Sequence, residues 1–230
     1  MVILQDIPLK LEFQKIKGRL HAVGEKGLVK AQALLEIAKP LISARALYKV
    51  CFIEERPRDA LVIDGTHFSS RVLQQNCEGV ERVFPFVVTI GSDLENEAEA
   101  GKDLMDKYYL DRIGNIALLT ARKYLEDHLR TKYALGGMSH MNPGSLKDWP
   151  IQEQRPLFSL LGDPEKAIGV QLNDSLLMIP RKSVSGIFFP TEVRFESCRL
   201  CPRERCDGRR ATYSETLARK YGILKEGHLQ

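Results

Sequence analysis

The chain lacks the features that mark several protein classes. Its 230 residues contain no apolar run near the roughly 18 residues that a membrane-spanning helix needs. Basic and acidic side chains number 34 and 30, a balance that does not argue for nucleic acid. The start, MVILQDIPLKLEF, carries Asp6 and does not combine a basic start with an apolar core. We therefore expect no signal peptide, no membrane or nucleic-acid partner, and a cytoplasmic location.

Cysteine is scarce and odd in number. The five cysteines are Cys51, Cys77, Cys198, Cys201 and Cys206. An odd count in a chain with no export signal argues against a framework of disulfides. The last three fall within nine residues, so their spacing is more informative than the total.

No internal repeat or low-complexity linker divides the chain, and 43% hydrophobic with 28% charged residues is ordinary for a globular protein. Apolar periodicity predicts helices at 28–38, 68–77, 104–133, 151–161 and 214–221, and strands at 44–53, 61–63, 83–90, 176–179 and 183–189. The turn signal Asp64-Gly65 should close the strand at 61–63. Pro85 should lie at the beginning of its strand or at an edge. These elements predict an α+β fold: a single domain around an antiparallel or mixed sheet with one long helix. We expect residues 1–190 to form this domain and residues 191–230 to form a cysteine-containing tail packed on it.

The stretch from Gly136 to Trp149 (GGMSHMNPGSLKDW) follows the longest helical pattern. Its two leading glycines stop that helix. Asn142-Pro143-Gly144-Ser145 is a turn, because proline sets φ, glycine supplies positive φ, and Asn and Ser bond nearby backbone. Such a loop suits a small polar ligand, and the alternative is a plain surface connection.

Two further patterns concern helices. Ser92 and Glu95 have the spacing of a capping box and predict a helix start. Gly114, Ala117 and Ala121 form a strip of small residues on the long helix. The strip indicates close packing on a sheet, or else a flat ligand.

The array Cys198-x2-Cys201-x4-Cys206 can bring three thiolates to one metal centre. Nearby arginines favour the thiolate form that metals need. An iron–sulfur cluster and zinc both fit soft ligands. The sequence does not decide the fourth ligand. For an iron–sulfur cluster it would be Cys51, Cys77, a non-cysteine group or an exchangeable molecule. For zinc it would be His128, His140 or a carboxylate. The alternative is three reduced cysteines without metal.

Five short stretches occur in order across about two thirds of the chain. They are Ala44 to Tyr48 (ARALY), Val88 to Gly91 (VTIG), Leu110 to Gly114 (LDRIG), Pro143-Gly144, and Met178 to Phe189 (MIPRKSVSGIFF). Together they resemble the activation domain of cobalamin-dependent methionine synthase, which binds S-adenosylmethionine and reactivates oxidised cobalamin. The chain is similar to the free-standing members. The cysteine array followed by Arg209-Arg210-Ala211 also resembles a tail of such stand-alone proteins from anaerobes.

The resemblance implies an α+β domain around a twisted antiparallel sheet. It also implies reductive methylation, in which cob(II)alamin is reduced by one electron and the cob(I) form takes a methyl group from S-adenosylmethionine. The protein then acts mainly by positioning the methyl group. The partner would be a separate corrinoid protein carrying cobalamin, with an electron donor such as flavodoxin or ferredoxin.

The predicted ligand cleft combines the turn with the last motif. Its expected cofactor-binding residues are His140, Met141, Asn142, Pro143, Gly144, Ser145, Ser185 and Gly186. Three positions depart from the family pattern: His140 replaces an arginine, Ser145 replaces a tyrosine, and Leu118 or Leu119 falls where the family has a glutamate. These positions would hold the ligand's carboxylate, ring face and amine, so we expect weak binding of S-adenosylmethionine.

Three interpretations follow. The chain is a corrinoid reactivator that uses S-adenosylmethionine, or an iron–sulfur electron-transfer protein of a corrinoid methyltransferase system that no longer uses S-adenosylmethionine, or a zinc-stabilised binding protein of that system.

Overall fold

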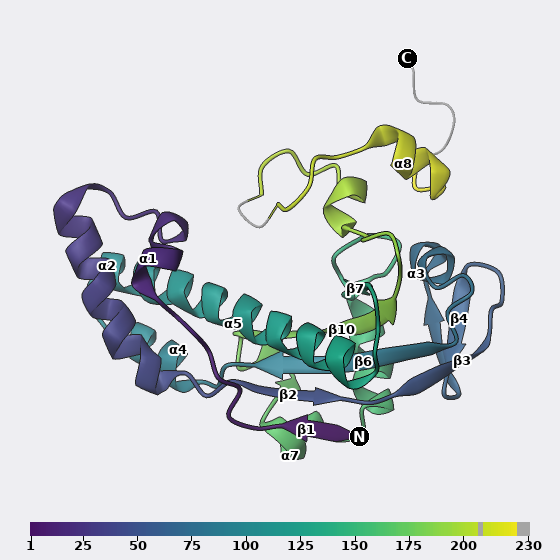
Figure 1. Cartoon of the computed structure of the whole chain (residues 1–230), viewed down its shortest axis with the longest axis horizontal. Coiled ribbons are helices and arrows are strands. Elements are labelled where there is room, and N and C mark those ends of the chain that lie inside the picture. The colour runs from purple at the N-terminus through teal and green to yellow at the C-terminus, as the bar shows by residue number, and fades with distance from the viewer. Residues whose placement is uncertain (207–208, 225–230) are drawn as a thin grey trace. The chain divides into compact units, whose positions relative to one another are not determined.

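The computed structural model describes residues 1–206 and 209–224, which form an α+β fold with antiparallel strand pairing. Helix α5 (Leu104–Lys132) has 29 residues and is the long helix that the periodicity predicts (Figure 1). The predicted fold class is therefore confirmed. The chain groups into two compact units, one of residues 1–48, 86–129 and 163–184 and one of residues 49–85, 130–162 and 185–230. The predicted boundary at residue 190 stays a prediction.

The first unit contains four short strands, residues 86–89 of a fifth, and most of the longest helix. Its elements are β1 (Val2–Leu4), α1 (Phe13–Ile16), α2 (Gly24–Ala38), β2 (Arg45–Tyr48), α4 (Asp93–Ala100), most of α5, α7 (Pro164–Ile168), β8 (Gln171–Leu172), β9 (Met178–Ile179) and short 3₁₀ turns. Strand β2 pairs with β1 and, on its other edge, with residues 86–89 of β6 (Arg82–Thr89). The Tyr48 hydroxyl lies 3.2 Å from His128 Nε2, which ties α5 to β2.

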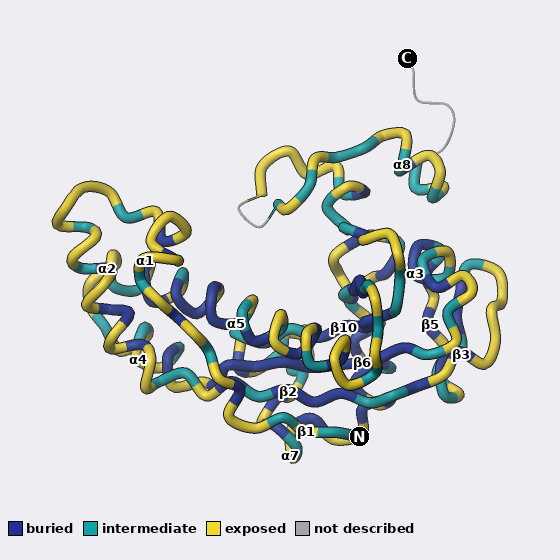
Figure 2. Tube along the Cα trace, viewed as in Figure 1, coloured by how far each residue is buried: buried dark blue, intermediate teal, exposed yellow. Residues whose placement is uncertain are grey.

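Apolar periodicity explains the face that α5 buries. Ile113, Ala117, Ala121 and Leu125 are fully buried or nearly so, and Figure 2 shows the buried stretches along this helix. Gly114 on the same helix lets the side chains of Leu94 and Lys182 approach closely. Close packing of the whole strip on a sheet stays a prediction. At the start of α5, Lys30 from α2 lies 2.7 Å from a carboxylate oxygen of Asp103.

The second unit is built on a separate set of antiparallel pairs. Its elements are β3 (Cys51–Glu55), β4 (Ala60–Ile63), β5 (Thr66–Ser69), α3 (Arg71–Asn76), β7 (Met138–Met141), α6 (Gln154–Leu160), most of β10 (Ser183–Pro190) and α8 (Glu215–Lys220). The β4–β5 hairpin turns through Asp64 and Gly65, both at positive φ, as the Asp-Gly signal predicts. Strand β7 pairs with β10.

Two local predictions need correction. Pro85 lies inside β6 and not at its beginning. Strand β6 pairs with β3 through residues 82–83 and with β2 from residue 86 onwards. Because Pro85 lies between these two pairings, its missing N–H breaks neither of them. Ser92 precedes α4 but makes no side-chain capping bond. The Glu95 carboxylate accepts hydrogen bonds from Arg181 instead of completing a capping box.

Within the described part of the chain, the helices are too short or too polar to cross a membrane.

Candidate functional site

The turn Asn142–Ser145 directly follows strand β7 and is closed by its own hydrogen bonds. The Gly144 N–H donates to the Trp149 carbonyl over 2.8 Å, and both the N–H and the hydroxyl of Ser145 donate to the Asn142 carbonyl. Gly144 has φ of +81°, and a β-carbon there would lie 2.8 Å from Ile151 Cδ1. Glycine is required at this position by both backbone and space.

The turn is fastened to the neighbouring strand β10. Asn142 Nδ2 donates to the Ser185 carbonyl, and the Cα of His140 pairs with that of Phe188 in the β7–β10 ladder. The structure therefore places residues 140–145 beside the strand that contains Ser185 and Gly186. These are the two stretches that the sequence combines into one ligand cleft. Their role as a cleft for a cofactor stays a prediction.

Burial separates the predicted residues into two groups. Met141, Pro143 and Gly186 are buried, and His140 is only 7% exposed with its ring 5.4 Å from that of Phe188. Gly144 and Ser145 are exposed. The buried group shapes the turn, and the exposed group is the part that a ligand can reach.

One buried polar atom beside the turn has no partner. The Ser185 hydroxyl is buried, and among the described residues it makes no hydrogen bond. A buried hydroxyl without a partner costs free energy unless another molecule bonds to it. The predicted cofactor-binding residues thus offer a rigid turn to a polar ligand, with one buried hydroxyl beside it that has no partner among the described residues.

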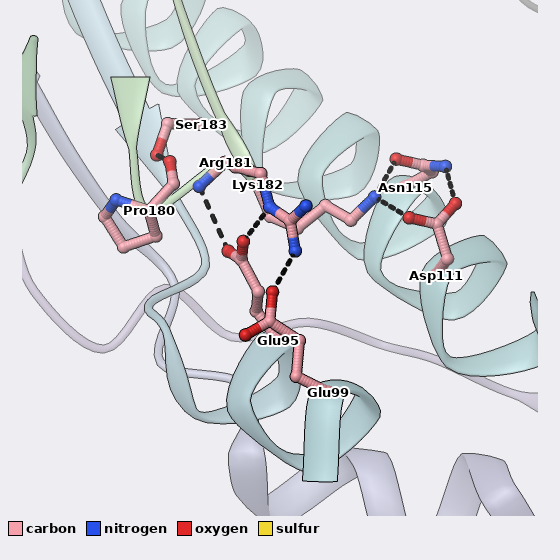
Figure 3. Close-up of polar contacts among 8 residues, drawn as sticks. All are labelled: Glu95, Glu99, Asp111, Asn115, Pro180, Arg181, Lys182 and Ser183. Carbon is pink, nitrogen blue, oxygen red and sulfur yellow. Dashed lines mark hydrogen bonds and ion pairs between the residues drawn. The ribbon is translucent and has the colours of Figure 1, made fainter. Parts of the chain in front are cut away.

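In the first unit, the turn before β10 contacts residues of two other resemblance stretches, and Figure 3 shows its bonds to α5. Lys182 Nζ lies 2.5 Å from an Asp111 carboxylate oxygen and 2.8 Å from Asn115 Oδ1, both on α5. The Lys182 carbonyl accepts the Ile90 N–H at the end of β6. Residues from VTIG, LDRIG and MIPRKSVSGIFF therefore build one corner. The sequence contains these motifs but does not show that Lys182 bonds to Asp111.

The same corner extends to α4. Arg181 pairs with Glu95 and, over 2.5 Å, with Glu99 (Figure 3). The Ser183 hydroxyl lies 2.9 Å from the Thr89 hydroxyl, and both residues are buried. A cavity of about 150 Å³ lies here, lined by Leu94, Glu95, Ala98, Leu110, Asp111, Arg181 and Lys182. Because its charged lining residues are already paired, the cavity has no free charge to hold a ligand.

A larger and more open cavity of about 600 Å³ lies in the second unit. Its lining includes the exposed Phe52, the acidic Glu81 and Glu192, and Arg82. The Arg82 guanidinium lies 5.1 Å from the centre of the Tyr133 ring, a cation–π arrangement. Sequence reasoning missed this cavity because its lining residues come from segments far apart in the chain.

The cysteine array does not form a metal centre in the described residues. Cys198 and Cys201 are half-buried and Cys206 is exposed, and no three His, Cys, Asp or Glu side chains in residues 1–206 and 209–224 come together to hold an ion. Cys51 and Cys77 are buried elsewhere. Iron–sulfur or zinc is thus not supported by this arrangement, and the metal site stays a prediction from the sequence.

No protein-family model matches the chain, and no curated protein matches it either. Solved structures do match, and they identify the fold as that of a reactivation domain. One of them is the crystal structure of the MetH reactivation domain bound to AdoHcy. Its TM-score is 0.56 with 18% sequence identity, over 82% of this chain and 73% of that one. The resemblance drawn from the sequence motifs is confirmed at the level of the fold.

Proposed function

We propose that the chain reactivates a separate corrinoid protein by reductive methylation, with S-adenosylmethionine as methyl donor. The observation that carries the proposal is the shared fold over 82% of the chain, together with the motifs that converge in it. In this reaction an external electron donor, such as flavodoxin or ferredoxin, reduces cob(II)alamin on the partner to cob(I)alamin by one electron. The carbon–sulfur bond of the sulfonium then breaks, a carbon–cobalt bond forms, and S-adenosylhomocysteine leaves. No acid or base is needed, so the chain acts by holding the donor in line and excluding water.

In this proposal the exposed turn Gly144–Ser145 holds the donor. The turn is already closed by its own bonds, so its shape is set before the ligand arrives. The same internal bonds occupy the N–H groups of Gly144 and Ser145, which leaves few backbone donors for a ligand. His140 packs against Phe188 and presents no exposed cation to a carboxylate. We therefore expect weak binding that depends mainly on shape.

A second candidate is an iron–sulfur electron-transfer or zinc-stabilised protein of the same corrinoid system. It is favoured by the replaced anchors, which are His140, Ser145 and either Leu118 or Leu119. Leu119 lies on α5 with 40% of its surface exposed, and it cannot bind an amine as a carboxylate would.

Two measurements separate the candidates. Calorimetry with S-adenosylmethionine and S-adenosylhomocysteine tests the donor site directly. Methyl transfer from labelled S-adenosylmethionine to a reduced corrinoid protein, followed by its absorbance spectrum, tests the reaction. Transfer that the chain accelerates supports the first candidate. Absence of binding and transfer rejects it. In that case, iron or zinc that copurifies under anaerobic conditions supports the second.

A further inference from the structure

The guanidinium of Arg209 lies within the cysteine loop, which we define as the described residues 198–206 and 209–211. Its Nη1 donates to the carbonyls of Cys198, over 3.2 Å, and Ala211, over 3.1 Å. Its Nη2 donates to the carbonyls of Cys201, over 3.2 Å, and Arg203. One side chain therefore joins four backbone carbonyls from both ends of the loop. A planar guanidinium can bond in four directions at once, whereas the ammonium of lysine has only three hydrogens on one atom.

The remaining donor of this side chain points into the protein. Arg209 Nε is buried, and the described residues contain no acceptor for it. The backbone N–H of the next residue, Arg210, approaches Cys198 Sγ at 3.5 Å. Two N–H groups of the loop, Arg209 Nε–H and the Arg210 amide, are therefore not bonded to any oxygen of the described residues.

Further contacts close the loop onto its surroundings. The Ser214 N–H donates to the Arg199 carbonyl over 2.8 Å, and Leu200 is 1% exposed. Glu196 pairs with Arg210 over 3.4 Å. After the loop, the Tyr221 hydroxyl donates to Asn76 on α3 over 3.1 Å. The loop is therefore anchored before and after the cysteines, and none of these contacts uses a thiol as a ligand.

We propose that Arg209 organises the cysteine loop and that the loop folds without a metal ion. The three thiols then lie on a preformed loop, two half-exposed and one exposed, accessible to a thiol reagent or to a thiophilic ion. This inference does not depend on the proposed methyl transfer. A metal centre at Cys198, Cys201 and Cys206, which the sequence predicts, would instead make the order of the tail depend on metal, because metal binding is coupled to folding.

Hydrogen exchange followed by mass spectrometry tests the proposal on the full chain after treatment with a chelator. The amides of Arg199, Cys201 and Ser214 are bonded in the loop and report its order. In the Arg209→Lys variant we expect them to exchange roughly tenfold faster or more, because each lost bond to a charged donor is worth about that factor. Arg205→Lys is the matched control, since Arg205 is exposed in the same loop and makes no hydrogen bond or ion pair with the described residues.

A triple variant, Cys198→Ser, Cys201→Ser and Cys206→Ser, distinguishes order that the bonds of Arg209 provide from order that a metal ion bound to the thiols would provide. If Arg209 organises the loop, the triple variant exchanges like the chelator-treated wild type. A thiol reagent should also modify three cysteines of the folded wild type rapidly, while the buried Cys51 and Cys77 stay protected. The proposal is overturned if the chelated wild type exchanges as fast as Arg209→Lys, or if the triple variant does so.

Discussion

The side chain of Lys182 crosses helix α5 directly over Gly114. A β-carbon at residue 114 would lie 3.2 Å from Lys182 Cε and 3.3 Å from Leu94 Cδ2. The absence of a side chain at Gly114 lets the lysine reach Asp111 and Asn115 on the same helix. This contact fixes the turn before β10 to α5, and it explains why LDRIG contains both an acid and a glycine.

Replacing Gly114 should therefore have graded effects. For Gly114→Ala we expect a free energy of unfolding within about 1 kcal/mol of the wild type, because the gain in helix propensity offsets slight crowding of flexible side chains. Gly114→Ile should lose roughly 1–3 kcal/mol by overpacking and should displace Lys182. Urea unfolding measures both. Gly18→Ile is the control, since Gly18 has open space around it; equal losses at the two positions would contradict the crossing.

The adjacent glycines 136 and 137 should differ sharply. A β-carbon at Gly137 would collide with the Thr191 carbonyl oxygen, whereas one at Gly136 would meet nothing within 4 Å. The Gly137 carbonyl also accepts the Thr191 N–H beyond the β7–β10 ladder. We expect Gly137→Ala to lower the free energy of unfolding by roughly 1–3 kcal/mol and Gly136→Ala to change it by less than about 0.5 kcal/mol. Thermal or urea unfolding of this pair needs no other control.

Stability should fall at alkaline pH through the buried thiols. Burial raises the pKa of the Cys77 thiol to about 12 from an ordinary value of 9.0. The folded chain therefore keeps a proton that the unfolded chain releases above pH 9, so this stabilisation is present below pH 9 and is lost as pH rises towards 12. We expect the advantage of the wild type over Cys77→Ala to shrink by about 1 kcal/mol between pH 8 and pH 10. A constant difference across this range in urea unfolding would show that Cys77 does not titrate as described.

Ligand binding should depend on the Asn142 side chain even though the proposed contacts lie at Gly144 and Ser145. Asn142→Ala removes the bond to the Ser185 carbonyl and loosens the turn. We expect affinity for S-adenosylmethionine, weak in the wild type, to fall by about tenfold, the value of one such hydrogen bond. Calorimetry measures the change. Lys147→Ala is the control at an exposed position near the turn, and equal loss in both variants would argue against a role for the anchor.

The elements with strong periodicity were predictable from the sequence. The spacing of apolar residues was enough to predict helix α5. The Asp64-Gly65 turn signal was enough to predict the turn between β4 and β5. Pro85 was placed wrongly because its tolerance inside β6 depends on where β6 changes partner along its length. The capping box at Ser92 failed because Glu95 has a stronger partner, Arg181, which is distant in sequence.

The candidate site shows the same division. Asn142, Gly144 and Ser145 were recognisable because turn chemistry is local. The pairing of Lys182 with Asp111 was not, since it joins residues 71 positions apart. The arrangement around Arg209 was hidden for another reason: an arginine among cysteines suggests charge compensation, and only the structure shows its bonds to carbonyls.

The anchor of the ligand turn has a consequence for how such a protein changes during evolution. Asn142 bonds to a main-chain oxygen of β10, and every amino acid at position 185 supplies that oxygen. Mutations along the strand can thus alter the chemistry facing a ligand without releasing the turn. During evolution, side chains that bind one small molecule can therefore be replaced by side chains that bind another, while the backbone conformation of the turn is kept.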